Sequence, residues 1–485
     1  MKQKSIKKNF VYNLILTSLN LIFPLVTSPY VSKILGATNI GKVNYATSII
    51  NWFVLFAAFG IPRYGIREIA MNRDDKKKLS TVFWNLIVIQ LIFSLISIVG
   101  YIILIFNVGS FRSDIYLYLV MILMIILNIF SIDWFYQGIE EYGYITLRNI
   151  IFKIISLVMI FTIIRHRDNY ILYALVNVFG LSFNNVLNYI HTKKYINKDI
   201  YEINVFKYIK KLKVFFYTTL IISIYTTLDQ TLIGVFSKKQ DLAFYVRSNT
   251  AINIGVNITN SIITVITPRA SYLVEKSHES YKKLMSQSIN YIYLLAFPCA
   301  IGLGILSKDI MILLGGKEFI PASYSLRIDC ILVLIVSMGT WQIQQILIPN
   351  RYENLAFKIQ CMAAVISTVL NLIFIPKFSY IAAATVWVIT EVFLVIIEGI
   401  IIDKKYKIIH IKYVTRSGIK YLIAALIMGL FIILIKFKIE HYLVVLLISL
   451  LISPVIYFGI ILIEKDEIVV GLFKQIVTKI KCIGK

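Results

Sequence analysis

The sequence predicts an all-α polytopic membrane protein that crosses the bilayer about fourteen times. Composition, repeated apolar segments and the distribution of positive charge all lead to this class. Of the 485 residues, 58% are hydrophobic and only 15% are charged, and the mean hydropathy is +0.78. Soluble domains have a much more polar composition. The chain is therefore expected to fold within a lipid bilayer.

Apolar segments repeat along the whole chain and are separated by short polar segments. Each has close to the roughly 20 residues that a helix needs to cross a bilayer. The basic N-terminus leads directly into the first of them, which we interpret as a helix and not as a removed signal peptide. The expected spans are 9–28, 42–62, 81–106, 116–136, 148–166, 169–191, 214–236, 245–268, 287–307, 327–349, 355–375, 380–402, 417–437 and 441–463.

Lysine and arginine alternate between the two sides of the membrane in the way that fourteen spans require. With the N-terminus inside, the inner segments hold 35 of the 50 Lys and Arg residues, the outer loops hold 12, and three lie within spans. Cytoplasmic loops normally carry this excess, so both termini are predicted to be cytoplasmic. The same rule accounts for the net charge of +25 without any nucleic acid partner.

The longest polar segments all lie on the inner side and suggest a division into lobes. Spans at the start of the two halves also begin with similar residues, and internal repeats in transporters usually place the substrate path at their interface. We expect an N-terminal six-helix lobe (1–191), a cytoplasmic linker (192–213), a C-terminal six-helix lobe (214–402), a terminal helix pair (403–463) and a basic cytoplasmic tail (464–485).

Polar side chains follow one face of several expected spans. In 245–268 the asparagines are spaced 4, 4 and 3 residues apart, which places them in one narrow sector of a helix. These stripes predict a hydrophilic cavity. Interhelical hydrogen bonding is the alternative, and it applies equally to Asn184 and Asn188 in 169–191. The predicted cavity-lining residues are Asn13, Asn20, Asn44, Asn51, Gln230, Asn249, Asn253, Asn257 and Asn260.

Charged residues within the spans are the remaining candidates for function, because charge inside a bilayer is costly. Asp229 and Glu391 are the best candidates for a site that couples transport to H⁺ or Na⁺, followed by Asp133 near an inner span end. A structural pair with a lysine or arginine on another helix is the alternative. The four cysteines are scattered, with no CxxC spacing and no histidine nearby, so no metal site or cofactor is predicted.

Three stretches near the N-terminus resemble the signature of a known family: 29–36, 40–49 and 58–70. They are similar to the Wzx-type polysaccharide repeat-unit flippases of the multidrug/oligosaccharidyl-lipid/polysaccharide exporter (MOP) superfamily, which has a MATE-like fold. The segments 133–138 and 227–245 also look like family segments. The family often has arginine where Lys33 stands, which keeps the charge but weakens bidentate anion binding.

The resemblance implies two six-helix lobes in a V plus two C-terminal helices. It also implies a cargo, undecaprenyl-pyrophosphate-linked oligosaccharide, which is flipped to the outer leaflet of a bacterial plasma membrane by alternating access. Expected partners are this lipid-linked sugar, the bilayer, a polysaccharide polymerase and a chain-length regulator. The asparagine stripes would bind sugar hydroxyls, and the pyrophosphate would bind Arg63, Lys33, Arg247, Lys153 and Arg269.

Three other functions compete with this one. A multidrug or cation antiporter on the same fold would need an acidic cavity, whereas the inferred lining is neutral to basic. A membrane polymerase or ligase would need a large external loop, and no external loop here exceeds about twenty residues. A flippase for another polyprenyl cargo, such as the peptidoglycan precursor lipid II or a teichoic-acid unit, stays open.

Overall fold

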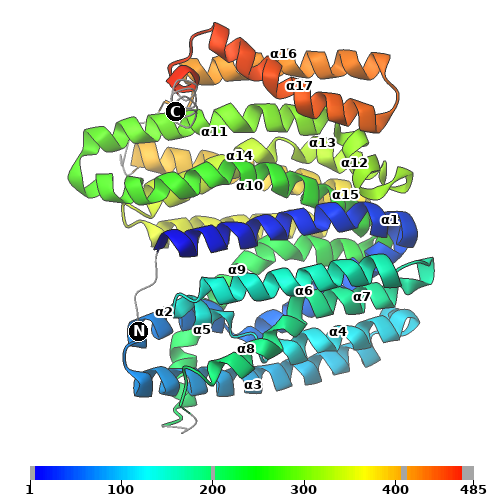
Figure 1. Cartoon of the computed structure of the whole chain (residues 1–485), viewed down its shortest axis with the longest axis vertical. Coiled ribbons are helices and arrows are strands. Elements are labelled where there is room, and N and C mark those ends of the chain that lie inside the picture. Colours follow the sequence, from blue (N-terminus) through cyan, green and yellow to red (C-terminus); the bar gives the residue numbers. More distant parts are fainter. Residues whose placement is uncertain (1–5, 198–201, 406–411, 472–485) are drawn as a thin grey trace, which may run out of the picture. The chain divides into compact units, whose positions relative to one another are not determined.

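The computed structural model describes residues 6–197, 202–405 and 412–471, and within these ranges it contains helices and no strands (Figure 1). The chain forms two compact units, Met1–Ala243 and Phe244–Lys485. Eleven of the described helices are long and apolar enough to cross a membrane, or twelve if one bent pair counts as a span. The predicted class, an all-helical polytopic membrane protein, is therefore confirmed.

The first unit runs from the blue to the green helices of Figure 1. Its elements are α1 (Ile6–Ala58), α2 (Ile61–Asn72), α3 (Lys76–Asn107), η1 (Gly109–Asp114), α4 (Ile115–Asn128), α5 (Asp133–Gly138), α6 (Tyr142–Ile163), η2 (Arg167–Asn169), α7 (Tyr170–Val178), η3 (Phe179–Phe183), α8 (Asn184–Thr192) and α9 (Val205–Phe236).

The helix α10 (Lys239–Lys276) begins in the last residues of the first unit and continues into the second. The other elements of the second unit are α11 (His278–Ile305), α12 (Ser307–Gly315), η4 (Lys317–Phe319), α13 (Ala322–Asp329), α14 (Leu332–Trp341), η5 (Gln342–Leu347), α15 (Glu353–Ile400), η6 (Ile401–Lys405), α16 (Arg416–Lys438) and α17 (Tyr442–Ile463).

Two very long helices each contain a break. Gly36 interrupts α1 with φ 74° and ψ 168°, and Ser379 interrupts α15 with φ 53° and ψ −135°. Glycine tolerates a positive φ because it has no Cβ. The predicted spans 9–28 and 42–62 thus lie on the two sides of the break in α1, and the predicted spans 355–375 and 380–402 lie on the two sides of the break in α15.

The polar segment 63–80, expected to connect two spans, contains the short helix α2. The chain enters α2 through Gly60, which has φ 75°, and Pro62 lies in the first turn, where proline fits a helix best. The buried side chains of α2 include Ile61, Tyr64 and Ile69, and the helix packs against α5, α3 and α9. Hydropathy alone could not identify α2 because only one of its faces is apolar.

Two predicted spans are irregular where polar side chains enter the protein interior. The span 169–191 consists of α7, one π-helical turn (η3) and α8. The span 327–349 combines α13, α14 and the π-helical η5, with a bend of 42° between α13 and the rest. Such π-helical turns are rare and often lie at functional sites.

The helix α9 packs against α1, α2 and α3 and completes the first unit. The aromatic side chains of Tyr64, Phe215 and Phe216 take part in this contact, which belongs to one buried apolar cluster of the unit. The predicted lobe boundaries around 192–213 stay a prediction.

Candidate functional site

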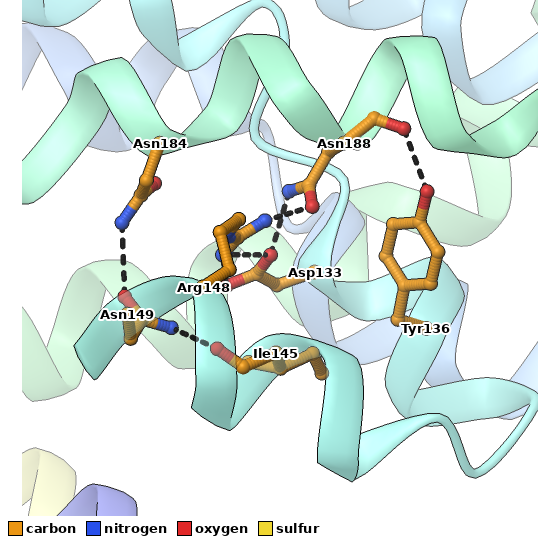
Figure 2. A network of polar contacts seen from close by, with 7 residues as sticks. All are labelled: Asp133, Tyr136, Ile145, Arg148, Asn149, Asn184 and Asn188. Carbon is orange, nitrogen blue, oxygen red and sulfur yellow. Dashed lines mark hydrogen bonds and ion pairs between the residues drawn. The ribbon is translucent and has the colours of Figure 1, made fainter. Parts of the chain in front are cut away.

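A charged network with buried members holds α5, α6 and α8 together in the first unit (Figure 2). Arg148 is 3% exposed and donates from Nη2 to both carboxylate oxygens of Asp133, at 2.8 and 3.1 Å. Asn188 donates from Nδ2 to the same carboxylate at 2.7 Å and accepts from Nη1 of Arg148. Tyr136 donates its hydroxyl to the backbone oxygen of Asn188 at 2.6 Å.

Aromatic side chains surround this network. The guanidinium of Arg148 lies 5.7 Å from the centre of the Tyr144 ring, and His191 stacks on that ring at 4.2 Å. Tyr195 donates to Glu141 at 2.9 Å, and burial together with this bond raises the pKa of Tyr195 to about 12. Its hydroxyl therefore stays protonated at neutral pH and keeps the bond.

Asp133 was predicted as a candidate for ion coupling, and the structure gives it two side-chain donors. Its carboxylate is satisfied by the guanidinium of Arg148 and the amide of Asn188. Such geometry is typical of a structural ion pair, although the predicted role in coupling is not tested by it. Sequence reasoning missed Arg148, because the pairing depends on the turn between α5 and α6.

The asparagine stripe of 169–191 hydrogen-bonds within the protein. Asn184 donates to Asn149 at 2.9 Å, as Figure 2 shows, and Asn188 belongs to the Asp133 network. Both asparagines are buried. In this span the polar side chains therefore join helices, which is the alternative that the sequence left open.

Two predicted site residues of different kinds meet on a more open face of the first unit. Lys153 of α6 donates from Nζ to the side-chain oxygen of Asn20 in α1, and this bond is solvent-accessible. The ammonium also lies 5.6 Å from the centre of the Phe23 ring. The ammonium of Lys153 is thus held by an amide oxygen and an aromatic ring, on helices of membrane-spanning character.

The other predicted cations are divided between the two units. Lys33 in α1 and Arg63 in α2 are exposed in the first unit. Arg269 is exposed on α10 in the second unit, whereas Arg247 is 9% exposed and its guanidinium lies 5.4 Å from the Phe319 ring centre. Arg247 is thus packed against an aromatic ring and is the least accessible of the five.

The asparagine stripe of α10 differs from that of 169–191 because its side chains are more accessible. Asn253 and Asn257 are exposed, and Asn249 and Asn260 are half-buried. The amide of Asn257 donates to the backbone oxygen of Asn253 at 2.6 Å. In the part of the chain that the structure describes, no hydrogen bond joins the side chains of two of these four asparagines. Their amides are therefore not used to bind one another.

The remaining predicted polar residues lie along α1 and α9. Asn51 is exposed, Asn44 and Gln230 are half-buried, and the side chain of Asn13 lies outside the described part of the structure. Asp229 is half-buried, and its carboxylate accepts from the backbone N–H of Gln230 at 2.7 Å.

Glu391, the last predicted acid, is 8% exposed in α15. It accepts a hydrogen bond from the indole of Trp387 at 3.4 Å. Sequence reasoning missed the fully buried Glu398, which lies seven residues further along α15. The spacing of these two glutamates, about two turns of an α-helix, was the signal that could have identified it.

The number of long apolar helices defines a polytopic membrane protein. Residues 6–274, more than half of the chain, match a family described as polysaccharide biosynthesis protein. The chain belongs to this family. Its relatives and fold place it among the Wzx-type flippases of the MOP superfamily, which confirms the resemblance seen in the sequence.

A curated relative is the putative O-antigen transporter of Escherichia coli strain K12. It is 22% identical over 394 residues, which cover 80% of this chain and 94% of the relative. A structure of the lipid II flippase MurJ in an inward closed conformation is similar with a TM-score of 0.75 and 17% identity, covering 95% of this chain and all of that chain.

A second similar structure is an inward-facing MATE family multidrug transporter of the MOP superfamily. It has a TM-score of 0.60 and 10% identity, and covers 80% of this chain and 96% of that chain. At such low identity both structures indicate the fold, and neither indicates the cargo.

Proposed function

We propose that this flippase moves polyprenyl-pyrophosphate-linked oligosaccharide repeat units from the cytoplasmic to the outer leaflet of a bacterial plasma membrane. The lipid tail stays in the bilayer while the polar head crosses along a hydrophilic path. Alternating access would expose that path first to one side and then to the other. The family match over residues 6–274 supports a role in surface polysaccharide synthesis.

The observation that carries the proposal at residue level is the contact of Lys153 with Asn20. Both residues come from helices expected to cross the membrane, and their hydrogen bond is accessible. A charged lysine within a membrane span is energetically costly, and such residues are usually functional. The negatively charged pyrophosphate can pair with the ammonium of Lys153, and Asn20 can hydrogen-bond to a neighbouring hydroxyl.

The exposed amides of α10, in the second unit, have the other chemistry that such a cargo needs. Asn253 and Asn257 each offer a side-chain carbonyl and an amide group. Neutral groups of this kind bind sugar hydroxyls without the desolvation cost of a charged wall. This chemistry suits a cargo whose sugars vary and whose only fixed charge is the pyrophosphate.

The membrane potential can help to drive this transport without ATP. A pyrophosphate head of charge about −2 that moves outward across an inside-negative membrane gains about 2.3 kcal/mol per charge per 100 mV. Exchange for H⁺ or Na⁺ at Asp229 or Glu391 would add to this. We keep that exchange as part of the proposal.

The topology proposed for this function has fourteen spans with cytoplasmic termini. An uninterrupted helix of the 53 residues in α1 would be about 80 Å long at 1.5 Å per residue, more than twice the bilayer core. The break at Gly36 divides it into two segments of suitable length, and Ser379 does the same for α15. Added to the twelve candidate spans, these two divisions support fourteen.

Export of surface polysaccharide by a strain that lacks its own flippase tests the proposal. The wild-type chain is expected to restore export. Arg63→Ala, Lys153→Ala and the double variant Asn253→Ala/Asn257→Ala are expected to reduce it while membrane insertion is unchanged. Lys238→Ala is a matched control, because this exposed lysine lies between two candidate spans. Normal export by all three site variants would contradict the assignment of the path.

Transport of lipid II, the alternative cargo that the sequence left open, is the second candidate function. The same chain is therefore expressed in a strain depleted of its lipid II flippase. We expect no rescue of growth there, because the family match concerns polysaccharide synthesis. Rescue of growth without restored polysaccharide export would favour lipid II as the cargo.

A further inference from the structure

Glu398 is a fully buried carboxyl near the end of α15 that the proposed path does not use. Its exposed fraction is 0%, and neither of its side-chain oxygens accepts a hydrogen bond within the described ranges. Buried polar groups almost always have partners. A buried carboxyl without one therefore requires an explanation.

The elements α14 and η5 pack against α15 at this position. A Cβ on Gly339 would lie 4.0 Å from Oε2 of Glu398, so the glycine brings the α14 backbone close to the carboxyl. Gln342 donates from Nε2 to the backbone oxygen of Val395 at 3.2 Å and to the hydroxyl of Tyr413 at 3.1 Å. The other side-chain atom of Gln342, Oε1, is buried and accepts no hydrogen bond.

No described lysine or arginine compensates a carboxylate at this place. None of the described lysine and arginine side chains forms an ion pair with Glu398. The sequence of α14 and η5 contains no charged residue. Among the described residues, the titratable groups that interact with Glu398 are Glu391, on the same face of α15 seven residues earlier, and the Tyr413 phenol before α16. An ionised carboxylate would be buried on the same helix face as a second acid, which is strongly unfavourable.

We propose that Glu398 is a proton-binding site in the second unit and that it takes up and releases one proton during the transport cycle. In the present conformation the carboxyl is protonated and neutral. The protonated carboxyl then has an O–H donor on the helix face that meets Gln342. Oε1 of Gln342 is a buried acceptor that receives no hydrogen bond from the described residues. The proton passes to water when a change of conformation opens the site. This step rests on the proposed alternating access.

The irregular backbone on both sides of Glu398 gives such a change a place to occur. The π-helical η6 begins three residues after it, and the π-helical η5 begins at Gln342 on the facing segment. Wide turns of this kind leave backbone groups that can be re-paired when helices move. Glu398 lies three residues before η6, on the helix against which η5 packs, so opening there would let water reach the carboxyl.

Infrared spectroscopy of the whole protein in lipid vesicles tests the protonation without any cargo. At pH 7 the wild type is expected to show the carbonyl stretch of a protonated carboxyl, and Glu398→Gln is expected to lose it. Glu353→Gln is the matched control, because Glu353 is an exposed glutamate at the start of the same helix. A band unchanged by Glu398→Gln would show that Glu398 is ionised and would overturn the proposal.

Export of surface polysaccharide tests release of the proton. Glutamine keeps the neutral shape but cannot release a proton, so Glu398→Gln is expected to slow export about tenfold, within the usual range of coupling between two ligands. Unchanged export together with loss of the infrared band would make the proton a fixed structural one and overturn the role in the cycle. The infrared result needs no cargo, so failure of the proposed function would not be mistaken for failure of this inference.

Discussion

Individual residues show two uses of polar groups in the same membrane protein. Asn188 is buried and hydrogen-bonded to Asp133, whereas Asn253 and Asn257 are exposed. Their sequence patterns are alike, because both follow the period of a helix. Burial and partners separate them, and neither can be read from the spacing alone.

The Asp133 network leads to a prediction about stability. Arg148→Ala leaves the carboxylate without its guanidinium, and Asp133 is about one-third exposed, so we expect the free energy of unfolding to fall by about 2 kcal/mol. Arg148→Lys is expected to rescue little, because a lysine cannot reproduce the two-sided contact with Asp133 and Asn188. Unfolding in detergent, followed by tryptophan fluorescence, measures the change.

The exposed Arg165 provides the control for that experiment. Within the described ranges its side chain donates to the backbone oxygen of Thr162, in the same turn, at 3.0 Å. Arg165→Ala should therefore change the free energy of unfolding by less than about 0.5 kcal/mol. Equal losses for Arg148→Ala and Arg165→Ala would show that the buried network does not stabilise the fold.

At the level of the helices, the sequence predicts most segments but not their irregularities. Hydropathy locates the apolar segments because lipid exposure leaves long apolar stretches. The helix α2 was missed since only one face of it is buried, and the π-helical turns η3 and η5 leave no mark in composition. The partner of Asp133 was missed for a related reason: it depends on packing between helices.

The break in α1 leads to a prediction at this level. Gly36 has φ 74° and ψ 168°, a backbone conformation that costs other residues about 1–3 kcal/mol. We expect Gly36→Ala to lower the free energy of unfolding by about 1 kcal/mol in the same fluorescence assay. Gly109→Ala is the matched control, because a Cβ there meets nothing within 4 Å and its φ is not positive. A loss no larger than that of the control would mean that α1 does not need glycine at its break.

At the level of the whole molecule, the number of spans decides which surfaces face the cytoplasm. Labelling of single cysteines with a membrane-impermeant maleimide, after replacement of the four native cysteines by serine, measures this directly. With fourteen spans, Thr38→Cys and Lys377→Cys should react in intact cells because both segments are outside. Lys76→Cys and Glu353→Cys should react only after the membrane is opened. All four positions are exposed in the structure.

The two external positions carry the most information, because each lies next to a break in a long helix. Thr38 follows Gly36, and Lys377 precedes Ser379. If α1 crossed the bilayer once, the side of every later loop in the first unit would change, and Lys76→Cys would react in intact cells. The charge alternation would then be reversed relative to the usual excess of lysine and arginine inside. Reaction at Thr38 and protection at Lys76 would instead establish Gly36 as the point where the chain turns back into the membrane.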